Sequence, residues 1–245
     1  MWGFELRKPA WEPPPGVEAR LSTRAGGVSD GRYGSCNLAE HVGDDAGAVG
    51  ENRMRFAAAL PGEPAVAWIR QEHGAEVLEA AAKLTGQEEP ACDGIWTARP
   101  GQACVVLTAD CVPLLLAAAD GSQVAAVHAG WRGLAAGIVA KACAAFGGKE
   151  IAAYIGPCIS AANYVVKEDV HERLRAAGGE DGLRRDDAGW HADLTAIARG
   201  QLRAAGVERI AVEGVCTFGT PRDFYSARRD GQASGRFATA VWRTA

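Results

Sequence analysis

The sequence is poor in histidine and methionine, and it has no long hydrophobic run. Only five histidines, at positions 41, 73, 128, 171 and 191, and two methionines occur in 245 residues. Five imidazoles are too few for the type 1 and trinuclear coppers of a complete multicopper oxidase, which rely on histidine ligands. The longest apolar run, Val112–Ala119, is far shorter than the roughly 20 residues of a membrane-spanning helix. The composition therefore excludes a full multicopper centre and predicts no membrane partner.

An excess of positive charge is also missing. The formal net charge is -4 and the isoelectric point is near 5.8, whereas a nucleic-acid partner requires a basic surface. The N-terminus carries charges from Glu5 onward and lacks the apolar core of a secretory signal. Seven cysteines, an odd number in a chain without such a signal, argue against a disulfide framework. These features predict a cytoplasmic protein that does not bind nucleic acid.

Short strands and helices follow one another without strict alternation. The expected strands are an edge strand within residues 1–20, followed by a Pro-rich connector, and then 65–70, 92–97, 103–108, 112–119, 123–128, 151–155, 209–215 and one near the C-terminus. The expected helices cover 45–60, 134–146, 166–177 and 194–205, and residues 22–45 form an ordered loop. This mixture predicts an α/β (α+β) fold in which mixed β-sheets are flanked by helices, in a single domain over residues 1–245.

The segment TADCVPLLLAAADGSQVAAVHAGWRG contains one cysteine and one histidine in an otherwise apolar run. Asp120-Gly121 is a strong hairpin signal, so residues 112–119 are expected to fold back on residues 123–128. The hairpin brings Cys111, before the first strand, close to His128, at the end of the second. Taken alone, each residue is better explained as part of the core, but the pairing makes a shared site as good an interpretation.

His73 is the candidate for a third partner, because the motif QEHG also follows a short strand. Two histidines and one cysteine form a known type of zinc site with an open fourth position. An open position is characteristic of catalytic zinc, which lowers the pKa of bound water to roughly 7. The sequence therefore predicts a zinc site formed by His73, Cys111 and His128.

Several polar residues near these motifs are candidates for catalysis or substrate binding. Arg24, in the glycine-rich STRAGGVS, and Arg132, before a helix start, are suited to bind phosphate. Asn37 is suited to bind a ribose hydroxyl. Asp110, next to Cys111, is suited to orient a histidine ligand or to act as a general base. Each also has a purely structural interpretation, as a loop salt bridge, a solvated side chain or a turn residue.

Two further sites have open interpretations. Arg228-Arg229, in YSARRDG, is either a substrate-closing pair or a solvated pair of charges, and Arg229 is taken as a substrate-binding candidate. Cys158, in IGPCIS, follows a strand and is either a nucleophile or a small buried residue, of which the second is the simpler interpretation. Trp131 and Phe224 offer rings for a purine, although core packing is the simpler interpretation of each.

The chain resembles the YfiH-like family, also known as laccase-domain or multicopper polyphenol oxidase proteins. The motifs that carry the resemblance run through most of the chain in order: STRAGGVS, NLAEHVGDD, ENR, QEHG, CDGIWT, TADCVPLLLA, AVHAGWRG, IGPCIS, HADLTAIARGQL, GVCTF and FYSARRDGQASGR. The resemblance implies a single YfiH/CNF-like catalytic domain. The sequence departs from the family pattern at one place. Relatives often have further cysteines after IGPCI, whereas this chain has Ser160 and Ala161.

The same resemblance implies a zinc-dependent purine nucleoside enzyme. Such an enzyme cleaves adenosine, inosine, guanosine or methylthioadenosine with phosphate, which makes it a transferase, and deaminates adenosine, which makes it a hydrolase. The family's metal ligands carry over to His73, Cys111 and His128. The motif of the known zinc nucleobase deaminases, His-x-Glu with Pro-Cys-x-x-Cys, is absent, because Ala161 stands at the second cysteine position. Deamination would therefore require a different arrangement.

Three alternatives stay open from the sequence. Two histidines and a cysteine also suit a copper redox site with an axial methionine, although Met1 and Met54 lie far from the trio in sequence. A cysteine hydrolase would pair Cys111 or Cys158 with His128. A metal-stabilised binding module would use the same ligands without turnover.

Overall fold

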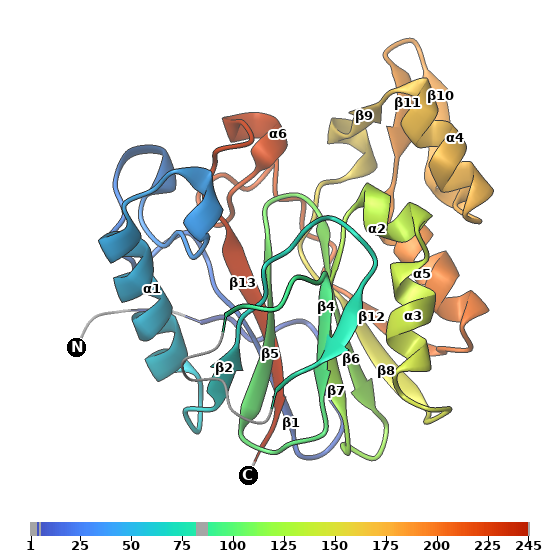
Figure 1. The fold of residues 1–245 in the computed structure, drawn as a ribbon. Coiled ribbons are helices and arrows are strands. Elements are labelled where there is room, and N and C mark those ends of the chain that lie inside the picture. Colours follow the sequence, from blue (N-terminus) through green and yellow to red (C-terminus); the bar gives the residue numbers. More distant parts are fainter. Residues whose placement is uncertain (1–3, 5, 82–87, 245) are drawn as a thin grey trace.

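The computed structural model describes residue 4, residues 6–81 and residues 88–244, and it contains two β-sheets packed face to face (Figure 1). A four-stranded sheet has the order β1-β13-β5-β2, formed by Val17–Leu21, Phe237–Arg243, Gln102–Thr108 and Ala65–Ala67. A six-stranded sheet has the order β12-β8-β6-β7-β4-β3, formed by Arg209–Val212, Ile151–Ile155, Val112–Ala118, Val124–Ala129, Gly94–Thr97 and Val77–Glu79. Both sheets combine parallel and antiparallel pairs, which confirms the predicted mixed-sheet α/β class.

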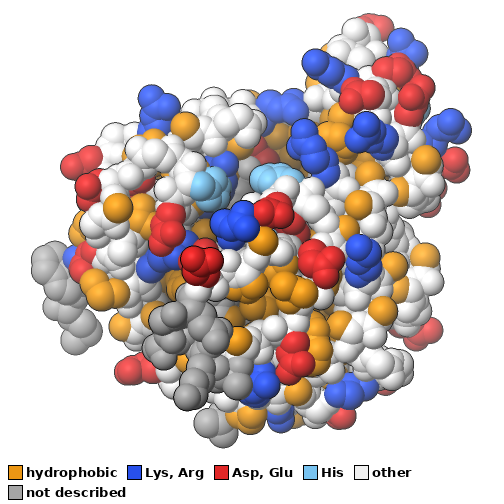
Figure 2. Space-filling view, viewed as in Figure 1, with side chains coloured by type: hydrophobic (Ala, Val, Ile, Leu, Met, Phe, Trp, Pro, Cys, Tyr) orange, Lys and Arg blue, Asp and Glu red, His pale blue; other side chains and the backbone are white. Residues whose placement is uncertain are grey.

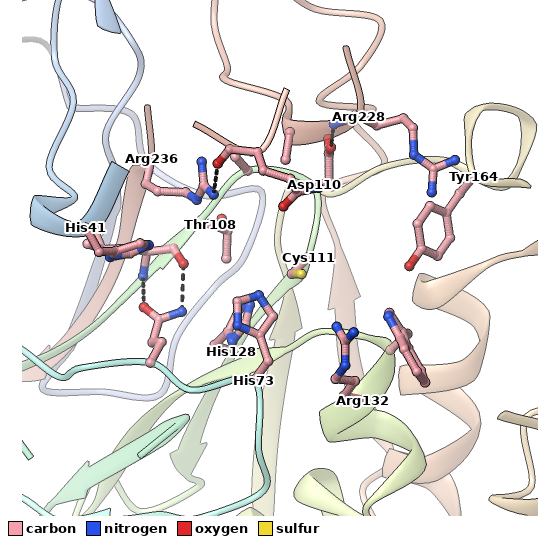
Figure 3. A pocket seen from close by; sticks show the side chains of 16 residues that line it. His41, His73, Thr108, Asp110, Cys111, His128, Arg132, Tyr164, Arg228 and Arg236 are labelled. Carbon is pink, nitrogen blue, oxygen red and sulfur yellow. Dashed lines mark hydrogen bonds between the residues drawn. The ribbon is translucent and has the colours of Figure 1, made fainter. Parts of the chain in front are cut away.

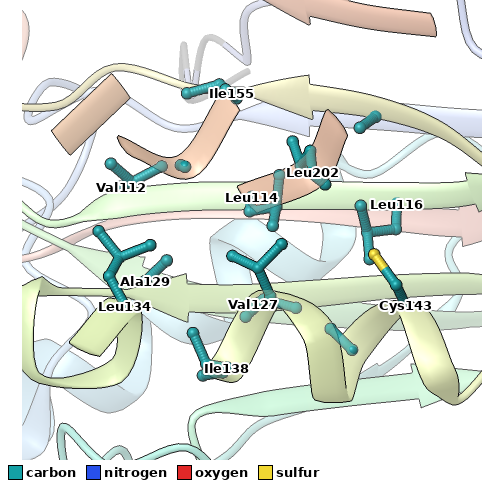
Figure 4. Close-up of a cluster of buried hydrophobic side chains, with 14 of the residues drawn as sticks. Val112, Leu114, Leu116, Val127, Ala129, Leu134, Ile138, Cys143, Ile155 and Leu202 are labelled. Carbon is teal, nitrogen blue, oxygen red and sulfur yellow. The ribbon is translucent and has the colours of Figure 1, made fainter. Parts of the chain in front are cut away.

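Helices cover the outer faces of the two sheets. Helix α1 (Ala46–Ala59) covers the four-stranded sheet, while α2 (Trp131–Ala135), α3 (Ile138–Ala144) and α5 (Leu194–Ala204) cover the six-stranded sheet (Figure 1). Figure 4 shows side chains of α3 and α5 packed against strands β6 and β7. The layers are therefore helix, sheet, sheet and helix. Within the described residues, no helix is long and apolar enough to cross a membrane.

The space between the sheets is filled by one face of each strand. Along β7, Val124 and Ala126 contact the other sheet, whereas Ala125 and Val127 contact the helices. Side chains alternate along a strand, so His128 extends the row of Val124 and Ala126 into the space between the sheets. This alternation places the His128 side chain at one end of the space between the two sheets.

The predicted hairpin of β6 and β7 is confirmed. Val112 pairs with Ala129 and Pro113 pairs with His128 in antiparallel register. Gly121 occupies the turn with φ of +71°, and a Cβ there would lie 2.3 Å from the Pro15 carbonyl oxygen, so only glycine fits. This register places Cys111 opposite Gly130, one position beyond the paired residues.

A third, smaller sheet forms an arm at the top right of Figure 1. It has the order β10-β11-β9, formed by Leu183–Asp186, Gly189–Ala192 and Val165–Val166, and α4 (Glu168–Ala176) lies beside it. The short helix α6 (Ala227–Asp230) lies at the same end of the molecule, above β5 and β13.

Several predicted boundaries were wrong. The expected helix over 134–146 begins earlier and is divided into α2 and α3, because Gly137 adopts a left-handed conformation with φ of +79°. The Pro-rich connector precedes β1 instead of following an edge strand. The strands expected at 65–70 and 209–215 end at Ala67 and Val212. The strands β3, β9, β10 and β11 were not predicted.

Candidate metal centre

A cavity of about 360 Å³ opens where the two sheets end, below α6 and beside the arm (Figure 3). Its wall includes the three predicted ligands, His73, Cys111 and His128. Figure 2 shows histidine side chains, in pale blue, at a hollow with basic and acidic side chains around it, and the basic residues that line the cavity are Arg132, Arg228 and Arg236. The cavity therefore combines imidazoles with positive charge.

Each of the three residues lies at the end of a strand or in a turn. Cys111 directly precedes β6, His128 lies near the end of β7, and His73 lies between β2 and β3. His73 has φ of +59°, a left-handed conformation that is uncommon outside glycine. The structure thus brings together three residues that are up to 55 positions apart in the sequence.

The three side chains fit a zinc ion. Their ligand atoms, the two imidazole nitrogens and the Cys111 Sγ, all lie within 4.8 Å of one another. Ligand atoms around a tetrahedral zinc are roughly 3.5 Å apart, given metal bonds of about 2.0–2.3 Å. Small side-chain movements would therefore complete the coordination. Their role as metal ligands remains a prediction.

Asp93 fixes the orientation of the His128 ring. Its Oδ1 lies 2.8 Å from His128 Nδ1, and both side chains are almost fully buried. A carboxylate accepts hydrogen bonds, so Nδ1 donates and the Nε2 lone pair is left for a metal. The ring of His73 packs edge-on against that of His128, with centroids 4.7 Å apart.

The electrostatics favour a thiolate at Cys111. Burial raises the pKa of the thiol, but the facing imidazoles of His128 and His73 outweigh burial and lower it to about 6. Burial lowers the pKa of His128, but Cys111 and Asp93 outweigh burial and raise it to about 9. A thiolate is the form of cysteine that binds metal, whereas the protonated His128 ring must release its Nε2 proton before that nitrogen can bind an ion.

Asp110 lies on the cavity wall, but its carboxylate does not contact a histidine ligand. It accepts hydrogen bonds from Thr217 Oγ1 at 2.6 Å, Ser226 Oγ at 2.9 Å and the Arg228 backbone N–H at 2.7 Å. Asp110 therefore holds the 217–228 loop. The orienting contact predicted for Asp110 is instead made by Asp93, which lies in the CDGIWT motif but was not predicted as a site residue.

Three of the predicted catalytic or substrate-binding residues lie outside the cavity wall. Arg24 donates to the carbonyl oxygens of Gly34 and Pro221, and its guanidinium lies over the ring of Tyr225. Asn37 is fully buried and contacts the Ala39 backbone and the Asp44 carboxylate. These contacts organise the 22–45 loop. The structure does not bring Arg24 or Asn37 to the metal ligands.

Arg229 is the third of these residues. Its guanidinium donates to the backbone carbonyls of Thr217, Phe218 and Phe224 and forms an ion pair with Asp230 at 2.6 Å. These partners lie in the loop before α6 and, for Asp230, in α6 itself. Arg229 therefore stabilises the loop around α6, and its neighbour Arg228 lines the cavity instead.

Arg132 lines the cavity, but it lies inside α2, whereas the sequence predicts it before the helix start. Its guanidinium lies 4.5 Å from the centroid of the Trp131 ring, and among the described residues it has no hydrogen-bond partner. Arg228 lies over Tyr164 at 4.8 Å on the same side of the cavity (Figure 3). Arginines and aromatic rings thus share one side of the cavity.

The other side carries His41, Thr108 and Arg236 (Figure 3), and Gln71 also lines the cavity; none of the four was predicted to line the site. Gln71 is bound to the Leu107 backbone at both ends of its amide, with distances of 2.9 and 2.8 Å. The Thr108 hydroxyl is buried and has no hydrogen-bond partner among the described residues. A buried hydroxyl without a partner is available to a ligand that enters the cavity.

Cys158 and Phe224 lie away from this cavity. Burial raises the pKa of Cys158 to about 12, and its Sγ lies 3.1 Å from Thr195 Oγ1. Phe224 is buried against Phe237. Met54 is largely exposed on α1, and Met1 lies outside the described residues, so the structure offers no axial methionine for copper among the residues it describes.

The chain matches a family model described as multi-copper polyphenol oxidoreductase laccase over residues 18–244. It is 39% identical over 240 residues to a Pseudomonas aeruginosa protein named purine nucleoside phosphorylase PA4543, with 96% of each chain covered. It is 40% identical over 246 residues to Escherichia coli K12 purine nucleoside phosphorylase YfiH, covering 97% of this chain and 98% of that protein.

Solved structures show the same fold. The Neisseria meningitidis protein NMB0706 superposes with a TM-score of 0.91 at 36% identity, and covers 98% of this chain and 99% of its own. YlmD from Geobacillus stearothermophilus also superposes with a TM-score of 0.91, at 31% identity, with 100% and 99% coverage. From the matched length and these identities, the chain belongs to the YfiH-like family, whose model is described as multi-copper polyphenol oxidoreductase laccase.

Proposed function

We propose that the chain is a zinc-dependent purine nucleoside phosphorylase formed by a single catalytic domain over residues 1–245. The observation that carries the proposal is the convergence of His73, Cys111 and His128 within 4.8 Å in a cavity that also holds Arg132. Relatives at about 40% identity carry the name purine nucleoside phosphorylase. The substrates proposed are adenosine, inosine, guanosine and methylthioadenosine, with deamination of adenosine as a second activity. The cytoplasmic location stays a prediction.

Phosphorolysis forms a bond between a phosphate oxygen and C1′ of the ribose and breaks the bond from C1′ to the purine nitrogen. Arg132 is suited to hold the phosphate, because its guanidinium lies over the Trp131 ring and makes no hydrogen bond among the described residues. The rings of Trp131 and Tyr164 offer stacking surfaces for the purine. Zinc, when bound, supplies Lewis acidity to this site at neutral pH. The buried Thr108 hydroxyl is available to a hydroxyl of the sugar.

The test is phosphate-dependent release of hypoxanthine from inosine by the zinc-loaded protein. We expect a chelator, or the variant C111A, to reduce the rate at least 100-fold, because a three-ligand zinc site does not survive the loss of its thiolate. The matched control is C143A, which removes a thiol from α3, outside the cavity. C143A should keep the wild-type rate. Full activity of C111A would contradict the proposal.

A second candidate, a cysteine hydrolase, is favoured by one specific observation. Cys111, His128 and Asp93 lie in the order nucleophile, base and orienting carboxylate, with Asp93 Oδ1 2.8 Å from His128 Nδ1. The two candidates differ in their need for His73. A hydrolase would work without zinc and would tolerate H73A, whereas the metal enzyme would lose both zinc and activity in H73A. Metal content and turnover of H73A therefore distinguish them.

A further inference from the structure

One buried carboxylate, that of Asp93, contacts both segments that supply the histidine ligands. Its Oδ1 accepts from His128 Nδ1 at 2.8 Å and from the His73 backbone N–H at 2.9 Å. Its Oδ2 accepts from the backbone N–H groups of Gly74 at 2.6 Å and Glu72 at 3.3 Å. Two ligands from separate elements therefore share one hydrogen-bond acceptor.

The position of Asp93 is itself fixed by its backbone. Its N–H donates to the Glu76 carbonyl at 3.0 Å, and its carbonyl accepts from the His128 N–H at 2.7 Å. The side chain is 1% exposed, so water does not compete for the carboxylate. The backbone and the side chain of Asp93 each form a hydrogen bond with β7, and each also forms hydrogen bonds with the 72–76 turn.

The turn that it holds has an unfavourable conformation. His73 has φ of +59°, which is costly for a residue with a Cβ. Three consecutive backbone N–H groups, those of Glu72, His73 and Gly74, point at the Asp93 carboxylate. Hydrogen bonds to a charged acceptor are stronger than neutral ones, and they offset this strain.

We propose that Asp93 is a positioning residue of the metal centre, which holds the His73 turn and the His128 ring so that the three ligand atoms converge before an ion binds. The inference rests on the proposed metal function and deepens it. Asp110 provides the natural comparison, because it is also a buried carboxylate with three hydrogen bonds and directly precedes Cys111. Its partners all lie in the 217–228 loop and none is a ligand.

The test measures zinc affinity by competition with a chromophoric chelator for the wild type, D93N and D110N. We expect the dissociation constant of D93N to rise 10- to 100-fold, the loss typical when a ligand's orienting partner is removed. That of D110N should stay within threefold of the wild type. A rise below tenfold in D93N, or an equal rise in D110N, overturns the proposal.

A second measurement separates positioning from a general loss of stability. Hydrogen exchange in the metal-free protein should become faster at residues 72–74 in D93N, while the same amides in D110N exchange as in the wild type. Unchanged exchange at residues 72–74 in D93N overturns the proposal. If D93N does not fold, D93E, which keeps the charge but moves it by one methylene, is judged by the same tenfold criterion.

The outcomes also separate this inference from the proposed function. A wild-type protein that binds no zinc contradicts the metal centre itself, and the role of Asp93 falls with it. A wild-type protein that binds zinc and cleaves inosine, together with a D93N variant of unchanged affinity, contradicts only the role of Asp93.

Discussion

At the scale of single residues, Arg229 shows how a predicted substrate residue can serve the fold instead. In YSARRDG the two arginines are equivalent as letters, but Arg228 lines the cavity and Arg229 binds backbone carbonyls. The difference is made by the position of each residue on α6, which the sequence pattern does not reveal. The clustering of His73, Cys111 and His128 was predictable because each lies at or near the end of a strand and the hairpin brings two of them together. Asp93 was not, because its role depends on backbone donors that leave no trace in residue type.

The pair of Asp230 and Arg229 gives a prediction for pH dependence. Burial raises the pKa of Asp230, but the hydrogen bond and charge of Arg229 outweigh burial and lower it below its usual value. Since the folded-state pKa lies below the unfolded value of about 3.9, the stabilisation is fully present above that value and is lost as the pH falls through the folded-state pKa. We expect D230N to lower the free energy of unfolding by about 1 kcal/mol at pH 6, because both side chains are partly exposed.

Urea unfolding of the wild type and D230N at pH 6 and at pH 2.5 measures this difference. The gap between the two proteins should shrink at pH 2.5. The variant D181N, at an exposed aspartate, serves as the control and should behave as the wild type at both pH values. A gap that is constant across the two pH values would show that the ion pair is not its source.

At the scale of the elements, the hairpin of β6 and β7 was predictable and its surroundings were not. Asp120-Gly121 sets a turn by local chemistry, and the register that places Cys111 opposite Gly130 follows from it. The helix after the hairpin was predicted as one element because the apolar pattern continues through residue 137. In the structure, Gly137 divides it into α2 and α3. Strands of two to four residues, such as β9 and β11, are too short to show a period and depend on pairing for their existence.

Gly130, in the turn between β7 and α2, tests whether the backbone approach to Cys111 matters. A Cβ at this position would lie 2.9 Å from Cys111 Sγ, although the backbone angles themselves permit alanine. We expect G130A to displace the thiolate and to weaken zinc binding about tenfold, with little loss of secondary structure. A zinc titration measures the affinity, and a circular dichroism spectrum measures the secondary-structure content.

The control for G130A is G50A, in α1, where a Cβ meets no atom within 4 Å. It should leave zinc affinity unchanged and should slightly stabilise the helix. Equal zinc affinity in G130A and the wild type would mean that the turn adjusts without moving Cys111.

At the scale of the whole molecule, the metal centre should be coupled to global stability. An ion that binds only the folded chain adds about 2.7 kcal/mol when its free concentration is 100 times its dissociation constant. For a chain of this size, that corresponds to a rise in melting temperature of about 5–10 °C. Differential scanning calorimetry of the metal-free protein, with and without zinc, measures the rise. C111A should show almost none, and the same rise in C111A would place the stabilising ion elsewhere.

The first and last strands of the chain meet in one sheet. Strand β13 lies between β1 and β5, with Val17 opposite Arg243 and Phe237 opposite Thr108. During synthesis, β1 and β5 emerge long before the strand that joins them, whereas all three proposed metal ligands precede residue 129. The nascent chain therefore carries these three residues while β5, which leads to Cys111, still lacks a neighbour on one side. Loss of residues 237–243 would separate β1 from β5, so the four-stranded sheet closes only after β13 has been synthesised and has paired with both.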